Sequence, residues 1–233
     1  MEVIKIQNNT LIEFDNVTKE YNFGSNTLKK LNNLNFKINK GEFVIIYGPT
    51  GSGKHTIFSL LAGLDKVSDG KIKINDNNLH LYNDEELSKY RFENISFLFN
   101  YYNFIPNMTI LENIELLKDL VDVDFDPLDI ICQLGFVGEE NTYPHRLKEN
   151  KYEKTVISSN KKEKIILCGE PINSKYDKKT IKNLSELSKE KDTTVIMITQ
   201  NKEITCMANK IINLKNGSIS EIFINKTPKI PAS

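Results

Sequence analysis

The sequence has no long hydrophobic run, no net charge and few cysteines, and each shortage excludes a class of protein. No apolar segment approaches the ~20 residues that an α-helix needs to span a bilayer, so any role at a membrane must be peripheral. Lysine plus arginine and aspartate plus glutamate both number 31. Because this zero net charge gives no support for nucleic-acid binding, we expect no nucleic-acid partner.

The three cysteines are widely spaced and lie in apolar stretches, at Cys132, Cys168 and Cys206. An odd number of scattered cysteines favours small buried hydrophobic residues in a reducing cytosol over a disulfide framework. The first residues, Met1 to Lys5, do not have the pattern of a secretory signal peptide. We therefore expect a cytoplasmic protein.

The most informative segment is a glycine-rich stretch between residues 48 and 56. It fits the pattern G-x-x-x-x-G-K-[ST], in which backbone N–H groups cradle the α- and β-phosphates of a nucleotide and the lysine reaches the β- and γ-phosphates. The predicted nucleotide-binding residues of this loop are Gly48, Pro49, Thr50, Gly51, Ser52, Gly53, Lys54, His55 and Thr56. One residue departs from the pattern, because His55 replaces the hydroxyl residue that ligates Mg²⁺.

The segments on either side of this phosphate loop support the prediction. Residues 42–47 form a short, largely apolar run that is typical of a buried parallel strand. Residues 54–61 predict a helix that ends before Gly63. A strand, a glycine turn and a helix in this order place a helix N-terminus against an anion.

Strands and helices alternate along the chain, which predicts an α/β fold with a parallel sheet and crossover helices. Further strands are expected at 11–14, 27–38, 71–74, 164–168 and 193–198. Further helices are expected at 83–91, 109–120, 128–134 and 178–189. Thr109 and Glu112 form a capping box at the start of the second of these helices.

Five other segments add a second pattern, at residues 17–21, 97–106, 143–147, 165–171 and 174–177. In this order and spacing beside a phosphate loop, they resemble the nucleotide-binding subunits of ABC transporters over nearly the whole chain. In particular, the chain looks like the short stand-alone ATPases of the lipoprotein-release, macrolide-export and antimicrobial-peptide-resistance type. In that family the five segments are the aromatic loop, the segment that meets the transmembrane partner, the lead into the signature, Walker B and the D-loop. The resemblance places Tyr21 to stack on adenine.

The resemblance implies a P-loop NTPase of the ABC type, an α/β fold with a RecA-like parallel-sheet core at about 1–96 and 155–225. It also implies an N-terminal antiparallel β subdomain, a small helical subdomain at about 97–154 and a flexible tail at 226–233, all within a single ATP-binding domain. The implied ligand is ATP or ADP. The implied partners are a transmembrane permease subunit and a second ATP-binding subunit, in a homodimer or a heterodimer, on the cytoplasmic face of a membrane.

The departures from the family pattern are concentrated at the catalytic positions. Gly169 replaces the Mg²⁺-associated aspartate of Walker B, Asn100 replaces the Q-loop glutamine, and Gln200 replaces the switch histidine. The signature, normally L-S-G-G-Q, reads Leu-Lys-Glu-Asn-Lys at 147–151. Glu170 retains the residue that the family uses as general base, and it is either functional or vestigial.

The consequence of these changes is a predicted loss of catalysis with retention of binding. Mg²⁺ prefers hard oxygen ligands, whereas His55 offers a softer nitrogen and Gly169 offers no side chain. Phosphoryl transfer relies on a metal that bridges the β- and γ-oxygens, so the rate is expected to fall by orders of magnitude. Binding is expected to persist through Lys54, Thr56, Tyr21 and the loop N–H groups. The sequence assigns no metal ligand and leaves Mg²⁺ in doubt: His55 is either an adventitious ligand or a position freed from selection on metal binding.

The altered signature bears on the oligomer, because in this family each signature completes the site of the opposite subunit. Glu149 there would set a carboxylate against phosphate, and two such charges ~4 Å apart repel by roughly 4 kcal/mol at an effective dielectric near 20. The alternative is that residues 147–154 form a solvated helix start with no ligand role. Since Walker B and signature defects lie in the same chain, a homodimer would carry both in each site.

Three functions remain open on the sequence alone. The favoured one is a degenerate ABC subunit that binds nucleotide, hydrolyses little or none, and acts as a structural or regulatory partner. The second is a working transport ATPase, powering export or lipoprotein or peptide transport, whose site has drifted. The third is a scaffold that no longer binds nucleotide.

Overall fold

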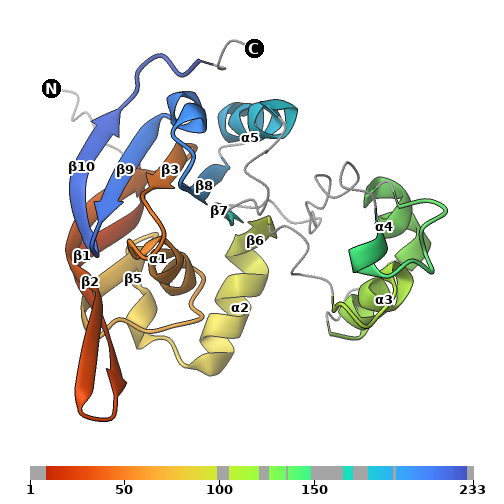
Figure 1. Cartoon of the computed structure of the whole chain (residues 1–233), viewed down its shortest axis with the longest axis horizontal. Coiled ribbons are helices and arrows are strands. Elements are labelled where there is room, and N and C mark those ends of the chain that lie inside the picture. Colours follow the sequence, from red (N-terminus) through yellow and green to blue (C-terminus); the bar gives the residue numbers. More distant parts are fainter. Residues whose placement is uncertain are drawn as a thin grey trace, which may run out of the picture.

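The computed structural model describes residues 9–98, 105–120, 126–134, 136–147, 165–169, 178–190 and 193–229. Their strands form two sheets, which lie face to face with helix α1 between them (Figure 1). One sheet has four strands and the other has six.

The four-stranded sheet is antiparallel, with the order β2-β1-β4-β5. Its strands are β1 (Thr10–Phe23), β2 (Asn26–Asn39), β4 (Asp69–Ile74) and β5 (Asn77–Asn78). This arrangement confirms the antiparallel subdomain expected near the N-terminus. β1 is much longer than the predicted strand at 11–14, because its second half pairs with β2 in a hairpin whose tip is exposed and carries no hydrophobic alternation.

The six-stranded sheet has the order β10-β9-β3-β8-β7-β6. Its strands are β3 (Phe43–Tyr47), β6 (Ile95–Leu98), β7 (Ile165–Cys168), β8 (Thr194–Thr199), β9 (Lys210–Lys215) and β10 (Ser218–Ile224). Five of them run parallel, and β10 is an antiparallel edge strand. The predicted parallel sheet is therefore confirmed, although three of its strands (β6, β9 and β10) were not predicted.

Five α-helices accompany the sheets in the described part of the chain. They are α1 (Lys54–Leu61), α2 (Asp84–Asn94), α3 (Ile110–Leu120), α4 (Pro127–Leu134) and α5 (Lys178–Glu190). All five match predicted helices. The predicted capping box is present: Thr109 N donates to Glu112 Oε2 at 2.6 Å, and Glu112 N donates to Thr109 Oγ1 at 3.3 Å.

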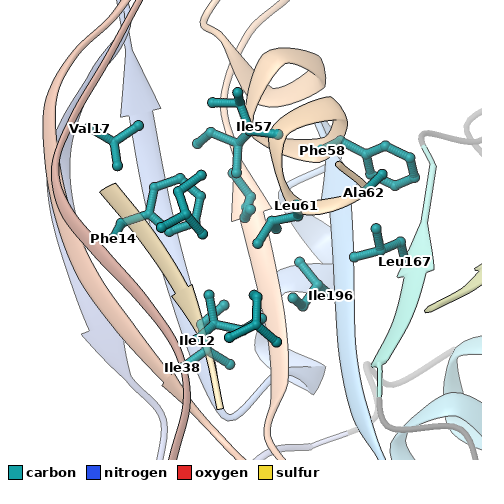
Figure 2. Close-up of a cluster of buried hydrophobic side chains, with 14 of the residues drawn as sticks. Ile12, Phe14, Val17, Ile38, Ile57, Phe58, Leu61, Ala62, Leu167 and Ile196 are labelled. Atoms are coloured by element: carbon teal, nitrogen blue, oxygen red, sulfur yellow. The ribbon is translucent and has the colours of Figure 1, made fainter. Parts of the chain in front are cut away.

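The hydrophobic core has one cluster on each face of the parallel sheet. Figure 2 shows the larger cluster, in which Phe14 of β1, Ile57 and Leu61 of α1 and Ile196 of β8 lie together. Because successive side chains of a strand point to opposite faces, Ile45 of β3 joins the second cluster under α5 instead. Burial on both faces explains why β3, β7 and β8 are continuous apolar runs.

Helices α3 and α4 pack against each other apart from the sheets (Figure 1). They enclose a separate hydrophobic cluster of Ile110, Ile114, Ile131, Phe136 and Leu147. This arrangement agrees with the small helical subdomain expected from the resemblance. No helix in the described ranges combines the length and the apolarity that crossing a bilayer requires.

The prediction that all three cysteines are buried is wrong. Cys168 is buried in β7, but Cys132 is exposed and Cys206 is only partly buried. Cys132 follows Ile131 on α4, and adjacent helical residues face different directions, so the isoleucine occupies the core and the thiol faces solvent.

Candidate functional site

The glycine-rich loop joins β3 to α1 and takes the conformation that its glycines permit. Gly51 and Gly53 have positive φ angles of 81° and 104°, and Gly53 is the N-cap of α1. A Cβ added to Gly48 would lie 2.5 Å from the carbonyl oxygen of Leu214, and one added to Gly53 would lie 2.7 Å from Leu31 Cδ2. Larger residues would therefore displace the loop from its support, which explains the glycine spacing seen in the sequence.

The loop holds a cation and a buried polar atom at the start of α1. Lys54 is only 2% exposed, and its Nζ donates to the carbonyl oxygens of Gly48 at 2.6 Å and Pro49 at 2.9 Å. Ser52 Oγ is buried and has no hydrogen-bond partner among the described residues. Such an atom fits a phosphate oxygen, as does the positive end of the α1 dipole.

The turn between β9 and β10 contacts the phosphate loop, and β2 in turn contacts that turn, although both are distant from the loop in sequence. Gly217, in the turn between β9 and β10, donates its N–H to Ser52 O at 3.0 Å, and Asn32 of β2 donates to Gly217 O at 2.8 Å. Gly217 has a φ of 75°, and an added Cβ would lie 2.5 Å from Lys30 O. Sequence reasoning missed this turn, although the Asn216-Gly217 pair between two apolar runs is a hairpin signal.

The ends of neighbouring strands bring other predicted residues to the loop. The N–H of Gly48 donates to Thr199 O at the end of β8 at 3.2 Å, and Thr50 Oγ1 donates to Gln200 Oε1 at 3.2 Å. Gly169 is buried and directly follows β7, the parallel neighbour of β8. Since parallel strands end at one edge of the sheet, the loop, Gln200 and Gly169 share that edge, where α/β folds bind ligands.

The two altered metal positions do not fit Mg²⁺. His55 is exposed on the first turn of α1 and carries an imidazole, and Gly169 has no side chain. In the ranges that the structure describes, no group of three or more histidine, cysteine, aspartate or glutamate residues is placed to hold a metal ion. Mg²⁺ requires oxygen ligands, which neither position supplies from its side chain.

Tyr21 lies half-buried near the end of β1, and a small polar network surrounds it. Its hydroxyl donates to Asp65 Oδ2 at 2.7 Å, and Lys19 Nζ lies over the ring, 4.8 Å from the centroid. Lys19 also pairs with Asp65 Oδ1 and donates to Lys66 O at 2.7 Å. Sequence reasoning missed Lys19 and Asp65; the period-2 spacing of Lys19 and Tyr21 on one strand was the available signal for Lys19.

The surroundings shift the pKa of both acidic groups in this network. Burial, then the hydrogen bond to Asp65 and its charge, raises the pKa of the Tyr21 phenol. Burial alone would raise the pKa of the Asp65 carboxyl, but hydrogen bonds from Lys19, Tyr21 and the Lys66 N–H outweigh it and lower that pKa. The network therefore favours a neutral phenol beside an ionised carboxylate.

Several predicted residues lie outside the described residues: Asn100, Glu170, signature residues 148–151 and the D-loop segment 174–177. The first signature residue, Leu147, is described and is buried in the cluster between α3 and α4. The structure thus brings the loop and Gln200 together and leaves the positions of the candidate base and the Q-loop residue as predictions.

Comparison with known proteins identifies the family. The ABC transporter family model matches residues 31–220. The uncharacterized ABC transporter ATP-binding protein MJ0796 of Methanocaldococcus jannaschii is 31% identical, over 90% of this chain and 95% of that protein. The bacitracin export ATP-binding protein BceA of Halalkalibacterium halodurans is 26% identical, over 90% and 87%.

A solved structure agrees with the sequence relatives. The dimeric MJ0796 cassette bound to ADP and Pi, in a post-hydrolysis state, has a TM-score of 0.79 and 29% identity, and the match covers 93% of this chain and all of that one. The family model spans most of the chain and includes the phosphate loop and the ends of β7 and β8. The chain therefore belongs to the ABC transporter family, as one of its ATP-binding domains.

Proposed function

We propose that this chain is a degenerate ABC ATP-binding subunit that binds ATP or ADP but hydrolyses it little or not at all. It would act as a structural or regulatory partner of a membrane permease, of a competent ATPase subunit, or of both. The observation that carries the proposal is a phosphate loop that keeps its glycines and Lys54, together with two metal positions, His55 and Gly169, that offer no oxygen ligand.

Nucleotide binding is supported by the geometry of the loop. The inward-facing Lys54 amine, the buried Ser52 hydroxyl and the glycine conformations together form an anion site at the start of α1. The similar MJ0796 cassette has been solved with ADP and Pi bound. Tyr21 and Thr56 would contact the rest of the nucleotide.

Weak hydrolysis follows from the chemistry of the altered positions. Transition-state charge in phosphoryl transfer is stabilised largely by the metal and by fixed donors. Gln200 is held against Thr50 of the loop, so an amide stands where the family places its switch histidine. An amide cannot change its charge near neutral pH as an imidazole can.

A permease partner is supported by relatives and by composition. One relative is named as a bacitracin export ATP-binding protein, and residues 97–106, which the resemblance places at the permease contact, are largely apolar. With a partner of that kind, the chain would bind at the cytoplasmic face of a membrane, paired with itself or with a second ATP-binding subunit.

The test is steady-state ATP hydrolysis by the purified chain, alone and with the products of neighbouring genes, beside a Lys54→Ala control. We expect calorimetry to detect ATP binding that Lys54→Ala abolishes, and hydrolysis no faster than that of Lys54→Ala. Turnover that depends on Lys54 would contradict the proposal. Absence of nucleotide binding would favour the scaffold instead.

The second candidate is an active export ATPase, which the name of the BceA relative favours. It requires that water or residues outside the described ranges supply what His55 and Gly169 lack. Turnover by the chain together with its permease, lost in Lys54→Ala, would establish it.

A further inference from the structure

We propose that Asp65 is a positioning residue that anchors the Tyr21 ring beside α1, so that the ring is a fixed platform for the base of the bound nucleotide. Such a role presupposes the nucleotide binding proposed for this chain, and it names a residue for which neither the phosphate-loop pattern nor the family motifs gave a reason.

Asp65 binds the phenol oxygen, which is the one polar atom of the Tyr21 side chain. The Tyr21 hydroxyl donates to Asp65 Oδ2 at 2.7 Å. Asp65 is ionised and only a quarter exposed, so this bond is charge-assisted and stronger than a neutral one. A bond at the tip of the side chain restricts its rotation.

Lys19 holds the carboxylate in place. Its amine, on a side chain only 11% exposed, pairs with Asp65 Oδ1 and donates to Lys66 O. The same amine lies over the Tyr21 ring, within the range of a cation–π contact. The carboxylate therefore has one oxygen for Lys19 and the other for Tyr21.

The anchor of the ring belongs to the segment that the phosphate loop opens, because Asp65 follows the end of α1. Tyr21 comes from β1 of the four-stranded antiparallel sheet. Without the bond to Asp65, the position of its ring relative to the phosphate loop would depend only on strand packing. The network thus sets the spacing between a base stacked on the ring and phosphates held in the loop.

The experiment compares a ligand that has a base with one that lacks it. Dissociation constants for ATP, and for inorganic tripolyphosphate by competition, are measured for the wild type, Tyr21→Ala, Tyr21→Phe and Asp65→Ala. We expect Tyr21→Ala to weaken ATP binding about tenfold, because stacking is lost. Tyr21→Phe and Asp65→Ala should each weaken it about threefold or more, because the ring remains but its anchor is gone.

Tripolyphosphate affinity should stay within about twofold in all three variants, since it reports only the loop. The double variant Tyr21→Phe/Asp65→Ala should bind ATP no worse than either single variant, because both changes remove the same bond. Asp65→Asn, which keeps an acceptor for the phenol, should bind ATP more tightly than Asp65→Ala. Asp15→Ala is the matched control: it removes a carboxylate paired with Lys71, six residues and about 20 Å along β1 from Tyr21.

Tyr21→Phe leaves the Lys19–Asp65 pair intact, so it tests the anchor even if Asp65→Ala does not fold. If Asp65→Ala weakens ATP and tripolyphosphate binding equally, the role of Asp65 is merely structural. If Asp65→Ala and Tyr21→Phe leave the ATP affinity unchanged, Asp65 does not position the ring. Either result overturns the inference. A wild-type chain that binds neither ligand would instead overturn the proposed function.

Discussion

Lys54 and His55 are adjacent on α1, but their surroundings differ completely. The lysine is buried, and its amine is bonded to two carbonyl oxygens of the loop, whereas the imidazole is exposed. The anion-binding half of the site is therefore well built, and the metal-binding half lacks oxygen ligands at two positions. A single residue cannot restore that half, because Gly169 would still offer no side chain.

We predict that restoring both positions makes nucleotide binding depend on Mg²⁺. The wild type should bind ATP with nearly the same affinity in Mg²⁺ and in EDTA. The double variant His55→Ser/Gly169→Asp should bind ATP at least about tenfold more tightly in Mg²⁺ than in EDTA, because a hydroxyl and a carboxylate then ligate the ion. Titration with a fluorescent ATP analogue, in Mg²⁺ and in EDTA, measures these affinities.

Each single variant is the matched control and should show little of this dependence. A wild-type chain whose ATP affinity already falls sharply in EDTA would contradict the prediction. It would mean that ligands outside the two positions hold the metal.

At the scale of elements, strands far apart in sequence are joined by specific polar contacts. Glu13 of β1 lies between Lys37 of β2 and Lys73 of β4, at 2.7 Å and 3.0 Å. These residues are also register partners across the sheet. Hydrogen bonds from Lys37 and Lys73 lower the pKa of the Glu13 carboxyl. Three strands are thus linked through one ionised side chain.

Glu13→Gln is predicted to destabilise the protein in a pH-dependent way. A carboxyl whose folded-state pKa lies below its unfolded value, about 4.3, stabilises the fold above that pH and loses the effect as the pH falls through the folded-state pKa. At pH 7 the variant should lose about 0.5–1 kcal/mol of unfolding free energy, since the pairs are partly solvent-screened. Urea unfolding should show the difference from wild type narrowing below about pH 4.

Glu221→Gln, on the exposed edge strand β10, controls for the substitution itself. If Glu13→Gln lowers the unfolding free energy by the same amount from pH 7 into the acid range, the loss does not depend on ionisation of Glu13. That result would contradict the prediction, because the loss would then be a packing effect.

The turn between β9 and β10 supports the phosphate loop, and Gly217→Ala should disrupt both. Its φ of 75° is strained for alanine, and the new Cβ would lie 2.5 Å from Lys30 O. Gly24→Ala is the matched control, since its φ is 61° but nothing lies within 4 Å of an added Cβ. We expect a loss of roughly 1 kcal/mol at Gly24 and at least about 2 kcal/mol more at Gly217, by chemical denaturation.

Gly217→Ala should also weaken ATP binding, because the Gly217 N–H donates to Ser52 O. Gly24→Ala should not. Equal losses of stability in the two variants, with unchanged ATP affinity, would show that the turn does not hold the loop.

At the scale of the whole molecule, the site is assembled from one edge of the parallel sheet, the antiparallel sheet and the C-terminal hairpin. The helical part, α3 and α4, has its own hydrophobic cluster and lies apart (Figure 1). In the family it carries the signature, which completes the site of a second subunit. We therefore expect the assembly of this chain to depend on what its own signature, residues 147–151, presents to a partner.

We predict that ATP does not drive this chain to form a homodimer. Each composite site would contain both the altered metal positions and Glu149, whose carboxylate would face phosphate and repel it by roughly 4 kcal/mol. Light scattering after gel filtration should give the same mass with and without ATP. An ATP-dependent dimer of the chain alone would contradict this, whereas a complex only with an intact second ATPase would agree with it.

Much of the fold was predictable because local pattern and tertiary burial agree. β3, β7 and β8 are apolar on both faces, and α1 follows a glycine loop, so short windows of sequence identify them. β9 was missed in part because it begins with Lys210, which reads as a surface residue. In the structure this lysine is buried, and its amine bonds to Glu42 Oε2 at 2.6 Å and Lys37 O at 3.0 Å. β10 is exposed along most of its length, and its four apolar residues, at 219 and 222–224, do not alternate regularly with polar ones.

The sequence by itself determined the family, the phosphate loop and the changes at His55, Gly169, Gln200 and the signature. Those features depend on the covalent order of residues within short segments. Only the tertiary structure decided that Asp65 holds Tyr21, that Gly217 supports Ser52 and that Gln200 meets Thr50. The partners in these contacts are separated by 44 residues or more. They meet because strand order and register, set by burial of the two hydrophobic clusters, bring the strand ends and turns to one place.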